Sequence, residues 1–178
     1  ALVAATVAEI GAAGSVDVTV SKIARRAGMS SALAHHYFGG KTQIIVAAMR
    51  HILRGYSAEV RRALENGPTG RRLEAIVHAS FAESCFEPDT ISAWLVFYVQ
   101  AQKEPEAARL LKVYQDRLQS ILVHALRGRC DDPKPVAETV AALIDGVYLR
   151  AALSGDGFGA GAADQVIGCA KALIGERV

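Results

Sequence analysis

Cysteine, proline and aromatic residues are scarce in this 178-residue chain, and each shortage narrows the class of protein. The 3 cysteines (Cys85, Cys130 and Cys169) are odd in number and far apart, which fits reduced thiols in a cytoplasm. No cysteine and histidine have the spacing of a zinc site, so neither a metal nor another cofactor is expected. Only 5 prolines, among abundant alanine, leucine and valine, favour an all-helical chain.

Long apolar runs are missing as well. The longest, around ISAWLVFYV, is far too short to cross a membrane, and no signal peptide is visible. We therefore expect a cytoplasmic protein with no membrane partner. Because the chain begins at Ala1 without a methionine, we expect an N-terminal arm to be missing from it. Hydrophobic residues at 51% and charged residues at 21% indicate a globular protein.

Net charge is only +2, but the charge is unevenly distributed. Residues 1–62 hold eight Lys and Arg against three acids, whereas the remaining 116 residues hold twelve against fifteen. A basic N-terminal part on an acidic body favours a polyanionic partner such as nucleic acid. The alternative is a chance fluctuation on a solvated surface.

Helical periodicity, interrupted by turn-rich stretches, predicts an all-α fold of eight or nine helices. Thr19 is a candidate N-cap, Gly14 and Gly28 are candidate helix ends, and Pro68 is well placed to open a helix. We divide the chain into a three-helix head (1–40) and a helical bundle (41–178). The expected helices cover 2–14, 19–28, 30–38, 41–64, 69–86, 89–102, 104–128, 134–154 and 162–175.

Two short helices joined at residues 27–30 match the helix-turn-helix plan, in which the second helix lies in the major groove of DNA. Five residues are expected to hold the pair together: Ile23, Ala24, Met29, Leu33 and Phe38. With Leu33 pointing into the core, helical spacing leaves Ser31, Ala32 and His35 for base edges. His36 lies beside them, on the face of Ala32.

Three further residues are suited to the phosphates that flank such a helix. Tyr37 offers a hydroxyl, Lys41 offers a charge at a helix start, and Thr19 lies at the start of the crossing helix. The alternative is an ordinary helical hairpin whose His35 and His36 merely face water. A metal site on these two histidines is disfavoured, because adjacent helical residues diverge by about 100°.

The stretch VTVSKIARRAGMSSALAHHYFGGKTQI resembles the DNA-binding segment of the TetR/AcrR repressors, with their pattern IA…AGVS…YYHF…K…L. Met29 stands where valine is usual, and Ile44 or Ile45 where leucine is usual. The resemblance implies a homodimer whose two heads read a palindromic DNA operator, and a body that binds a small-molecule effector. It also implies phosphate contacts by Thr19, Tyr37 and Lys41, and base contacts by Ser31, Ala32 and His35.

In the body, ISAWLVFYVQAQKEPEAARLLKVYQDRL and AALIDGVYLRAALSG resemble segments of the BetI-type repressors. These control choline uptake and the oxidation of choline to glycine betaine. The resemblance implies a transcriptional repressor that responds to choline. The alternative within the family is a sensor of another small hydrophobic or cationic compound.

Five body residues are candidates for the effector pocket. Trp94, Phe97 and Tyr98 share one helical face, and Tyr148 follows Asp145 by three residues. Rings beside one carboxylate suit a quaternary ammonium through cation–π attraction. The alternatives are an aromatic stripe that forms core, and an Asp145 that hydrogen-bonds in the core or pairs with Arg150 at a dimer seam.

The last two long helices present wide apolar faces, which the family resemblance assigns to a four-helix dimer interface. Packing within one bundle is the alternative. The faces contain Val140, Ala141, Ile144, Val147, Tyr148 and Ala151, then Val166, Ile167, Ala170, Leu173 and Ile174.

Two other classes of protein fit less well. An enzyme would need acid–base groups such as Asp145, His78 or His124, but no nucleophile–base pair, metal spacing or phosphate loop accompanies them. A helical interaction module that dimerises without touching DNA is disfavoured by the basic head. We therefore expect a regulator and not an enzyme.

Overall fold

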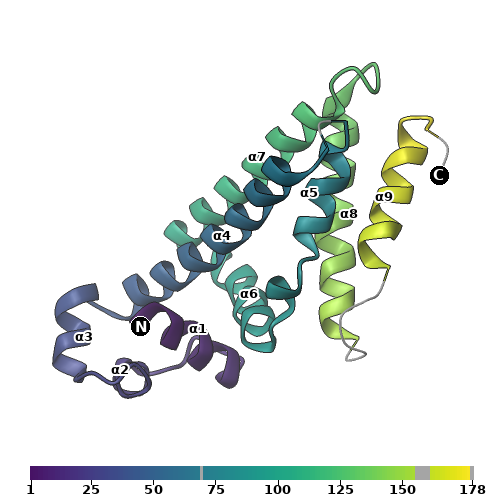
Figure 1. Ribbon diagram of the computed structural model, residues 1–178. Helices are drawn as coiled ribbons and strands as arrows, with labels where there is room; N and C mark the ends of the chain where they lie inside the picture. The colour runs from purple at the N-terminus through teal and green to yellow at the C-terminus, as the bar shows by residue number, and fades with distance from the viewer. Residues whose placement is uncertain (69, 155–160, 177–178) are drawn as a thin grey trace. The chain divides into compact units, whose positions relative to one another are not determined.

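The computed structural model describes residues 1–68, 70–154 and 161–176, and all regular elements within them are helices (Figure 1). They are α1 (Leu2–Ala13), α2 (Val20–Arg26), α3 (Ser31–Phe38), α4 (Lys41–Asn66), α5 (Arg72–Ser80), the 3-10 helix η1 (Glu83–Phe86), α6 (Pro88–Ala101), α7 (Pro105–Leu126), α8 (Pro133–Leu153) and α9 (Ala162–Leu173). The prediction of an all-α chain is confirmed. No helix of this described part has both the length and the apolar character to cross a bilayer.

The helices gather into two compact units. Unit 1 comprises Ala1–Gly55 and Glu87–Lys112, and unit 2 comprises Tyr56–Phe86 and Val113–Val178. The long helices α4 and α7 contribute to both units. The boundary between two compact units can differ from the boundary between two functional domains. The predicted functional boundary after residue 40 therefore remains a prediction.

Side-chain hydrogen bonds cap the short helices of the head, at Thr19 as expected and also at Ser30. The Thr19 hydroxyl accepts a hydrogen bond from the Lys22 N–H (3.2 Å), and Ser30 does the same for the Leu33 N–H (3.2 Å). Gly28 adopts the left-handed conformation (φ 71°) between α2 and α3, which a residue with a side chain rarely adopts. The turn of the helix-turn-helix is therefore determined locally.

One predicted helix is wrong in its extent. The expected helix over 69–86 is instead α5 followed by the separate 3-10 turn η1. Pro68 does not open α5, which begins at Arg72; the Pro68 carbonyl instead accepts a hydrogen bond from the Arg71 N–H (2.9 Å). The turn around Pro68 thus ends before the helix starts.

Within unit 1, α6 packs closely along α1. A Cβ on Gly11 would lie 2.5 Å from the Cα of Asp89, so only glycine permits this approach. The core of the unit includes Ile10, Ile23, Ile44 and Met49, all essentially inaccessible to solvent. These residues come from α1, α2 and α4, and the short α3 packs against α2.

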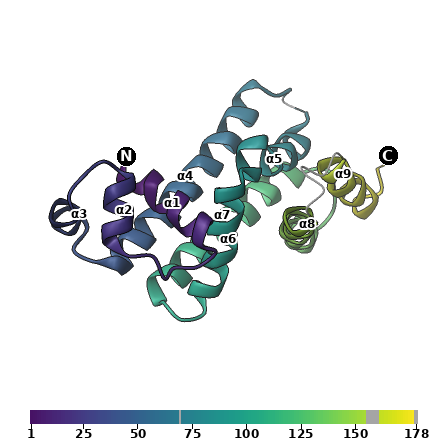
Figure 2. The ribbon, with the colours of Figure 1, turned by 90° about the horizontal axis from the view of Figure 1, so that it is seen from below.

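Within unit 2, apolar side chains of α5, α7, α8 and α9 form a second core. Among its buried members are Leu73, Ile76, Leu118, Leu122, Val140 and Val166. Helix α9 packs against both α8 and α5, and runs alongside α8 in both views (Figures 1 and 2). Apolar side chains of α8 and α9 thus pack against other helices of the same chain.

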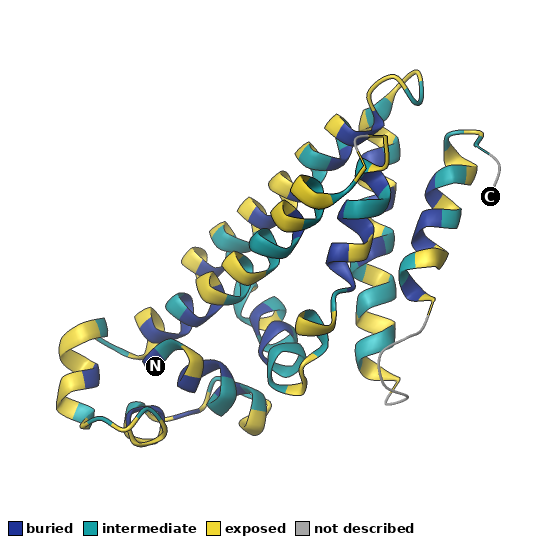
Figure 3. Cartoon of the chain, viewed as in Figure 1, coloured by how far each residue is buried: buried dark blue, intermediate teal, exposed yellow. Residues whose placement is uncertain are grey.

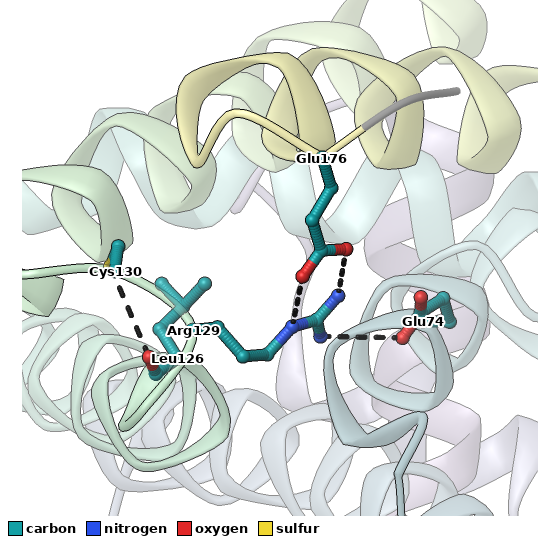
Figure 4. Close-up of polar contacts among 5 residues, drawn as sticks. All are labelled: Glu74, Leu126, Arg129, Cys130 and Glu176. Carbon is teal, nitrogen blue, oxygen red and sulfur yellow. Dashed lines mark hydrogen bonds and ion pairs between the residues drawn. The ribbon is translucent and has the colours of Figure 1, made fainter.

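Arg129, in the turn between α7 and α8, joins three parts of unit 2 (Figure 4). Its guanidinium donates to both carboxylate oxygens of Glu176 (3.0 and 2.7 Å) and forms an ion pair with Glu74 of α5 (3.6 Å). The hydrogen bonds from Arg129 lower the pKa of the Glu176 carboxyl. Arg129 therefore ties the segment after α9 to the rest of the unit.

Replacing Arg129 by methionine is expected to lower the free energy of unfolding by about 2 kcal/mol at neutral pH, because the half-buried Glu74 loses its cation. Urea denaturation measures this. Since the folded pKa of Glu176 is lowered, its ion pair stabilises above the unfolded pKa and is lost as pH falls through the folded pKa. The difference should therefore shrink in acid. Arg127→Met, at an exposed position nearby, is the control; equal effects of both variants would contradict this role of Arg129.

Candidate functional site

Helix α3 turns nearly all of its surface to solvent (Figure 3). Only Ala34 is fully buried, and it packs α3 onto the remainder of the head. His35, His36 and Tyr37 are exposed, and the Tyr37 side chain reaches 70% exposure. The rings of His36 and Tyr37 meet edge to face, with centroids 6.0 Å apart. The helix therefore presents donors, acceptors and rings outward, as a major-groove helix requires.

The prediction that Leu33 points into the core is wrong. Leu33 is 42% exposed, and its neighbour Ala34 occupies the inward position. Because successive helical residues are about 100° apart, this rotates the expected faces by one residue. Ala32 and Leu33 are both on the exposed surface of the first turn of α3.

Ser31 is the least exposed of the predicted base-reading residues. Its hydroxyl lies 3.2 Å from that of Ser21, so the two hydroxyls link α3 to α2. Ala32, His35 and His36 carry no such contact to α2 in this part of the structure. Ser31 thus has a role in joining the helices, beside any role toward a base.

The predicted phosphate residues lie at helix starts. Thr19 is exposed, and its hydroxyl oxygen already caps α2, which leaves its O–H as a possible donor. Lys41 begins α4, and its Nζ lies 3.5 Å from Asp17 Oδ1. This contact is exposed and therefore weak, so a phosphate can compete for the ammonium group.

A second candidate site lies within unit 2, around Asp145. The Tyr114 hydroxyl donates a hydrogen bond to Asp145 Oδ1 (2.9 Å). Burial raises the pKa of the Asp145 carboxyl, and the bond from Tyr114 opposes this in part. No ion pair links Asp145 to a lysine, arginine or histidine of the described residues. The alternative of a pairing with Arg150 at a dimer seam remains a prediction.

Aromatic rings accompany this carboxylate. The Tyr56 and Tyr114 rings meet edge to face at 5.5 Å, and the Phe86 and Tyr148 rings are 4.9 Å apart. Tyr148 also donates to the Cys85 carbonyl (2.8 Å), which fixes its ring. Asp145 and Tyr148 therefore belong to one cluster, as their spacing on α8 predicted.

Sequence reasoning missed three members of this cluster, namely Tyr56, Phe86 and Tyr114. They come from α4, η1 and α7, so no local spacing joins them to Asp145. Burial raises the pKa of the Tyr56 hydroxyl, and raises that of the Cys85 thiol to about 11. Both groups are consequently neutral at physiological pH and add no competing charge.

The other three predicted pocket residues belong to unit 1. Trp94 and Phe97 are buried in its core, Phe97 with only 1% of its surface exposed. Trp94 meets Tyr98 edge to face at 5.4 Å. Their burial agrees with the alternative of a core stripe, and their part in a pocket remains a prediction.

The apolar faces predicted for dimerisation are partly buried in the single chain and partly exposed, as at Leu173, and their role in a dimer remains a prediction. Val140, Ile144, Val166 and Ala170 are buried within unit 2 itself, so packing within one bundle accounts for them. A different stripe of α8 faces outward, and its members are small or apolar. It consists of Ala142, Gly146, Leu149 and Leu153, and α9 adds Cys169, Ala172 and Leu173.

No cluster of His, Cys, Asp and Glu in the described residues has a composition and geometry suited to a metal ion. The two candidate sites in this part of the chain are the outward face of α3 and the carboxylate–aromatic cluster of unit 2.

Two family descriptions match the chain. Residues 2–48 match the bacterial regulatory proteins of the tetR family, and residues 70–172 match the C-terminal domain of the BetI-type transcriptional repressors. The first match covers the head with α3, and the second covers Asp145 and its neighbours.

Curated relatives agree with these matches. The HTH-type transcriptional regulator BetI of Agrobacterium fabrum is 48% identical over 86% of this chain and 76% of its own length. That of Brucella anthropi is 44% identical over 99% of this chain and 93% of its own length.

Solved structures share the fold. A putative transcriptional regulator from Pseudomonas aeruginosa PAO1 has a TM-score of 0.83 at 26% identity, covering 98% of this chain and 86% of its own. One from Saccharomonospora viridis, in complex with choline, has a TM-score of 0.80 at 22% identity, covering 98% and 93%.

Proposed function

We propose that this protein is a choline-responsive repressor. The family is the starting point: the chain belongs to the TetR family of DNA-binding transcriptional regulators and to its BetI-type branch. As a homodimer it would bind a palindromic operator and control genes for glycine betaine synthesis. Its relatives are regulators of a non-enzymatic family, and the chain is not an enzyme.

The observation that supports the DNA contacts is the exposed polar face of α3. Base edges in the major groove would meet Ala32, His35 and His36, with Ser31 beside them. On the flanks, Thr19 and Tyr37 would donate hydroxyl protons to phosphates, and Lys41 would add its charge. Phosphate contacts give affinity for all sequences, whereas base contacts give preference for one.

Lys41→Ala is expected to weaken binding to every duplex by roughly tenfold, because each head loses one phosphate contact. The slope of log affinity against log salt should fall by about one for each head. Mobility shifts at several salt concentrations, with random and selected duplexes, measure both.

Two variants serve as comparisons for Lys41→Ala. Lys134→Ala, at an exposed lysine of α8, should leave DNA binding unchanged. His35→Ala should change which sequences are preferred while the salt slope stays nearly the same. Unchanged binding of Lys41→Ala to all duplexes would show that the phosphate contact lies elsewhere.

The observation that supports the effector is Asp145, a carboxylate within the protein that has no cationic partner among the described residues. Such a group is costly unless a cation compensates it. The electron-rich faces of Tyr56, Tyr114 and Tyr148 attract a quaternary ammonium, which needs no hydrogen-bond acceptor. Choline combines this head group with one hydroxyl, and the choline complex of the Saccharomonospora viridis regulator agrees with the assignment.

Asp145 and Tyr148 remain our proposal for the effector site within unit 2, with Tyr56, Phe86 and Tyr114 added. The role predicted for Trp94, Phe97 and Tyr98, which belong to unit 1, remains a separate proposal. Calorimetric titration with choline tests choline as the effector. Heat of binding together with a rise in melting temperature is expected. The absence of both at millimolar choline would reject choline, and a response to another cationic compound would support the alternative sensor.

Regulation requires that effector binding and operator binding be coupled. Helix α4 carries Lys41 at its start and Tyr56 further along, so one helix belongs to both proposed sites. An effector shifts operator affinity only by its own difference in affinity for the two states. Footprinting with and without choline would show the direction of this coupling.

A further inference from the structure

An exposed leucine on α3 has no role in the proposed contacts. Leu33 is 42% exposed although the head has a complete core from α1, α2 and α4. Single exposed apolar residues are common and need no explanation by themselves. Leu33, however, adjoins exposed Ala32, and both are in the first turn of the helix that enters the groove.

The position of this pair is significant for base recognition. In a helix-turn-helix, the N-terminal residues of the second helix contact the base edges. Ala32 and Leu33 offer neither a donor nor an acceptor, so they cannot read the polar pattern of a base pair. The one apolar group in the major groove is the C5-methyl group of thymine.

We infer that Leu33, with Ala32 beside it, reads a thymine through that methyl group. This goes beyond the proposed function and rests only on the binding of DNA by α3; neither a palindrome nor choline is required. Leu33 shares a helical face with Tyr37, one turn later. A phosphate contact by Tyr37 would therefore hold Leu33 at a fixed place along the groove.

The specificity that results differs from that of the histidines. A histidine ring offers a hydrogen-bonding nitrogen and distinguishes bases by their donors and acceptors. Leu33 distinguishes thymine from cytosine by a methyl group and by the absence of a donor that it would leave unpaired. Each half-site should thus contain a thymine whose methyl group matters more than its hydrogen-bonding edge.

Deoxyuridine tests this inference, because it differs from thymidine only in lacking the methyl group. A duplex is first selected from a random pool by the wild-type protein, and each of its thymines is then replaced singly by deoxyuridine. At one thymine of each half-site, replacement should weaken wild-type binding roughly fourfold, the value of one buried methyl group. At that position, Leu33→Ala should bind the thymine duplex and the deoxyuridine duplex equally. At all other thymines, its loss of affinity on replacement should match that of the wild type.

Val99→Ala is the matched control, since Val99 is an apolar residue of similar exposure on α6 (50%, against 42% for Leu33). It should keep the full response to deoxyuridine. Because Leu33 is exposed, Leu33→Ala should also keep the wild-type melting temperature, which shows that its head is folded.

Several results would overturn the inference. They are the same deoxyuridine response in Leu33→Ala as in the wild type, an equal loss by Leu33→Ala on all duplexes, and no sensitive thymine at all. A pool that yields no preferred sequence would overturn it too. A preferred sequence with a single half-site would contradict the palindrome instead, and the deoxyuridine comparison would still decide on Leu33.

Discussion

Leu149→Glu combined with Leu153→Glu is expected to yield a monomer that binds the operator more than 100-fold less tightly than the wild type. Both leucines lie on the outward stripe of α8, and Leu153 is 65% exposed in the single chain. An interface around a two-fold axis buries the same stripe of both copies, so dimerisation would bury four like charges without partners. Two linked heads gain affinity by roughly 10²- to 10⁴-fold over one head, and a monomer loses that gain.

Sedimentation velocity at micromolar concentration gives the oligomeric state, and mobility shifts give the affinity. The variant should retain its helical circular dichroism, because neither leucine is in the core. A second double variant, Val99→Glu with Val113→Glu, adds the same charge at exposed apolar positions of α6 and α7. It should remain a dimer with wild-type affinity.

Either half of this prediction can fail by itself. A Leu149→Glu, Leu153→Glu variant that stays dimeric would place the interface on another surface. A monomer with undiminished operator affinity would show that one head suffices for binding.

Asp145→Asn is expected to weaken choline binding by roughly 30- to 150-fold, equivalent to about 2–3 kcal/mol for a cation that loses its carboxylate. The substitution keeps the shape of the side chain and an oxygen that accepts the Tyr114 bond. DNA binding without choline should be unaffected, since the head is untouched. Calorimetry gives the choline affinity, and mobility shifts give the response of the operator complex.

Asp145→Asn should lower choline affinity but should not lower the stability of the fold. Since the folded pKa of Asp145 is raised, its contribution to stability is full below the unfolded pKa and is lost as pH rises through the folded pKa. At neutral pH, Asp145→Asn should therefore melt no lower than the wild type. Choline affinity of the wild type should fall as acid protonates Asp145, whereas the variant should show no such dependence.

Asp164→Asn, at an exposed acid of α9, is the control and should bind choline normally. Tyr114→Phe removes only the hydrogen bond to Asp145 and should have an intermediate effect. A variant Asp145→Asn with wild-type choline affinity would move the site to other residues.

The fold of the head could be predicted from the sequence because its determinants are local. Thr19, Ser30 and Gly28 cap or turn the chain within a few residues of themselves. The rotation of α3 could not be predicted in this way. Leu33 and Ala34 are both apolar, and only the tertiary packing of the head decides that the smaller side chain is inside.

The candidate sites show the same limit. The spacing of Asp145 and Tyr148 placed them together correctly, because one helix holds both. Tyr56 and Tyr114 come from helices far apart in the chain, and their ring contact depends on packing that no local pattern encodes. The outward stripe of α8 was missed because Val140 and Ile144 are more hydrophobic than Ala142 and Gly146, and hydrophobicity favours the inside.

Ala34 is the buried residue in the middle of α3, so the residue that packs α3 on the head is distinct from the residues that face outward. Caps at Ser30 and Gly39 hold the helix whatever its outward residues are. New side chains at positions 32, 33, 35 and 36 should consequently retarget the protein to other promoters at little risk to folding. A set of mutually insulated genetic switches that share one effector could be assembled from this single chain.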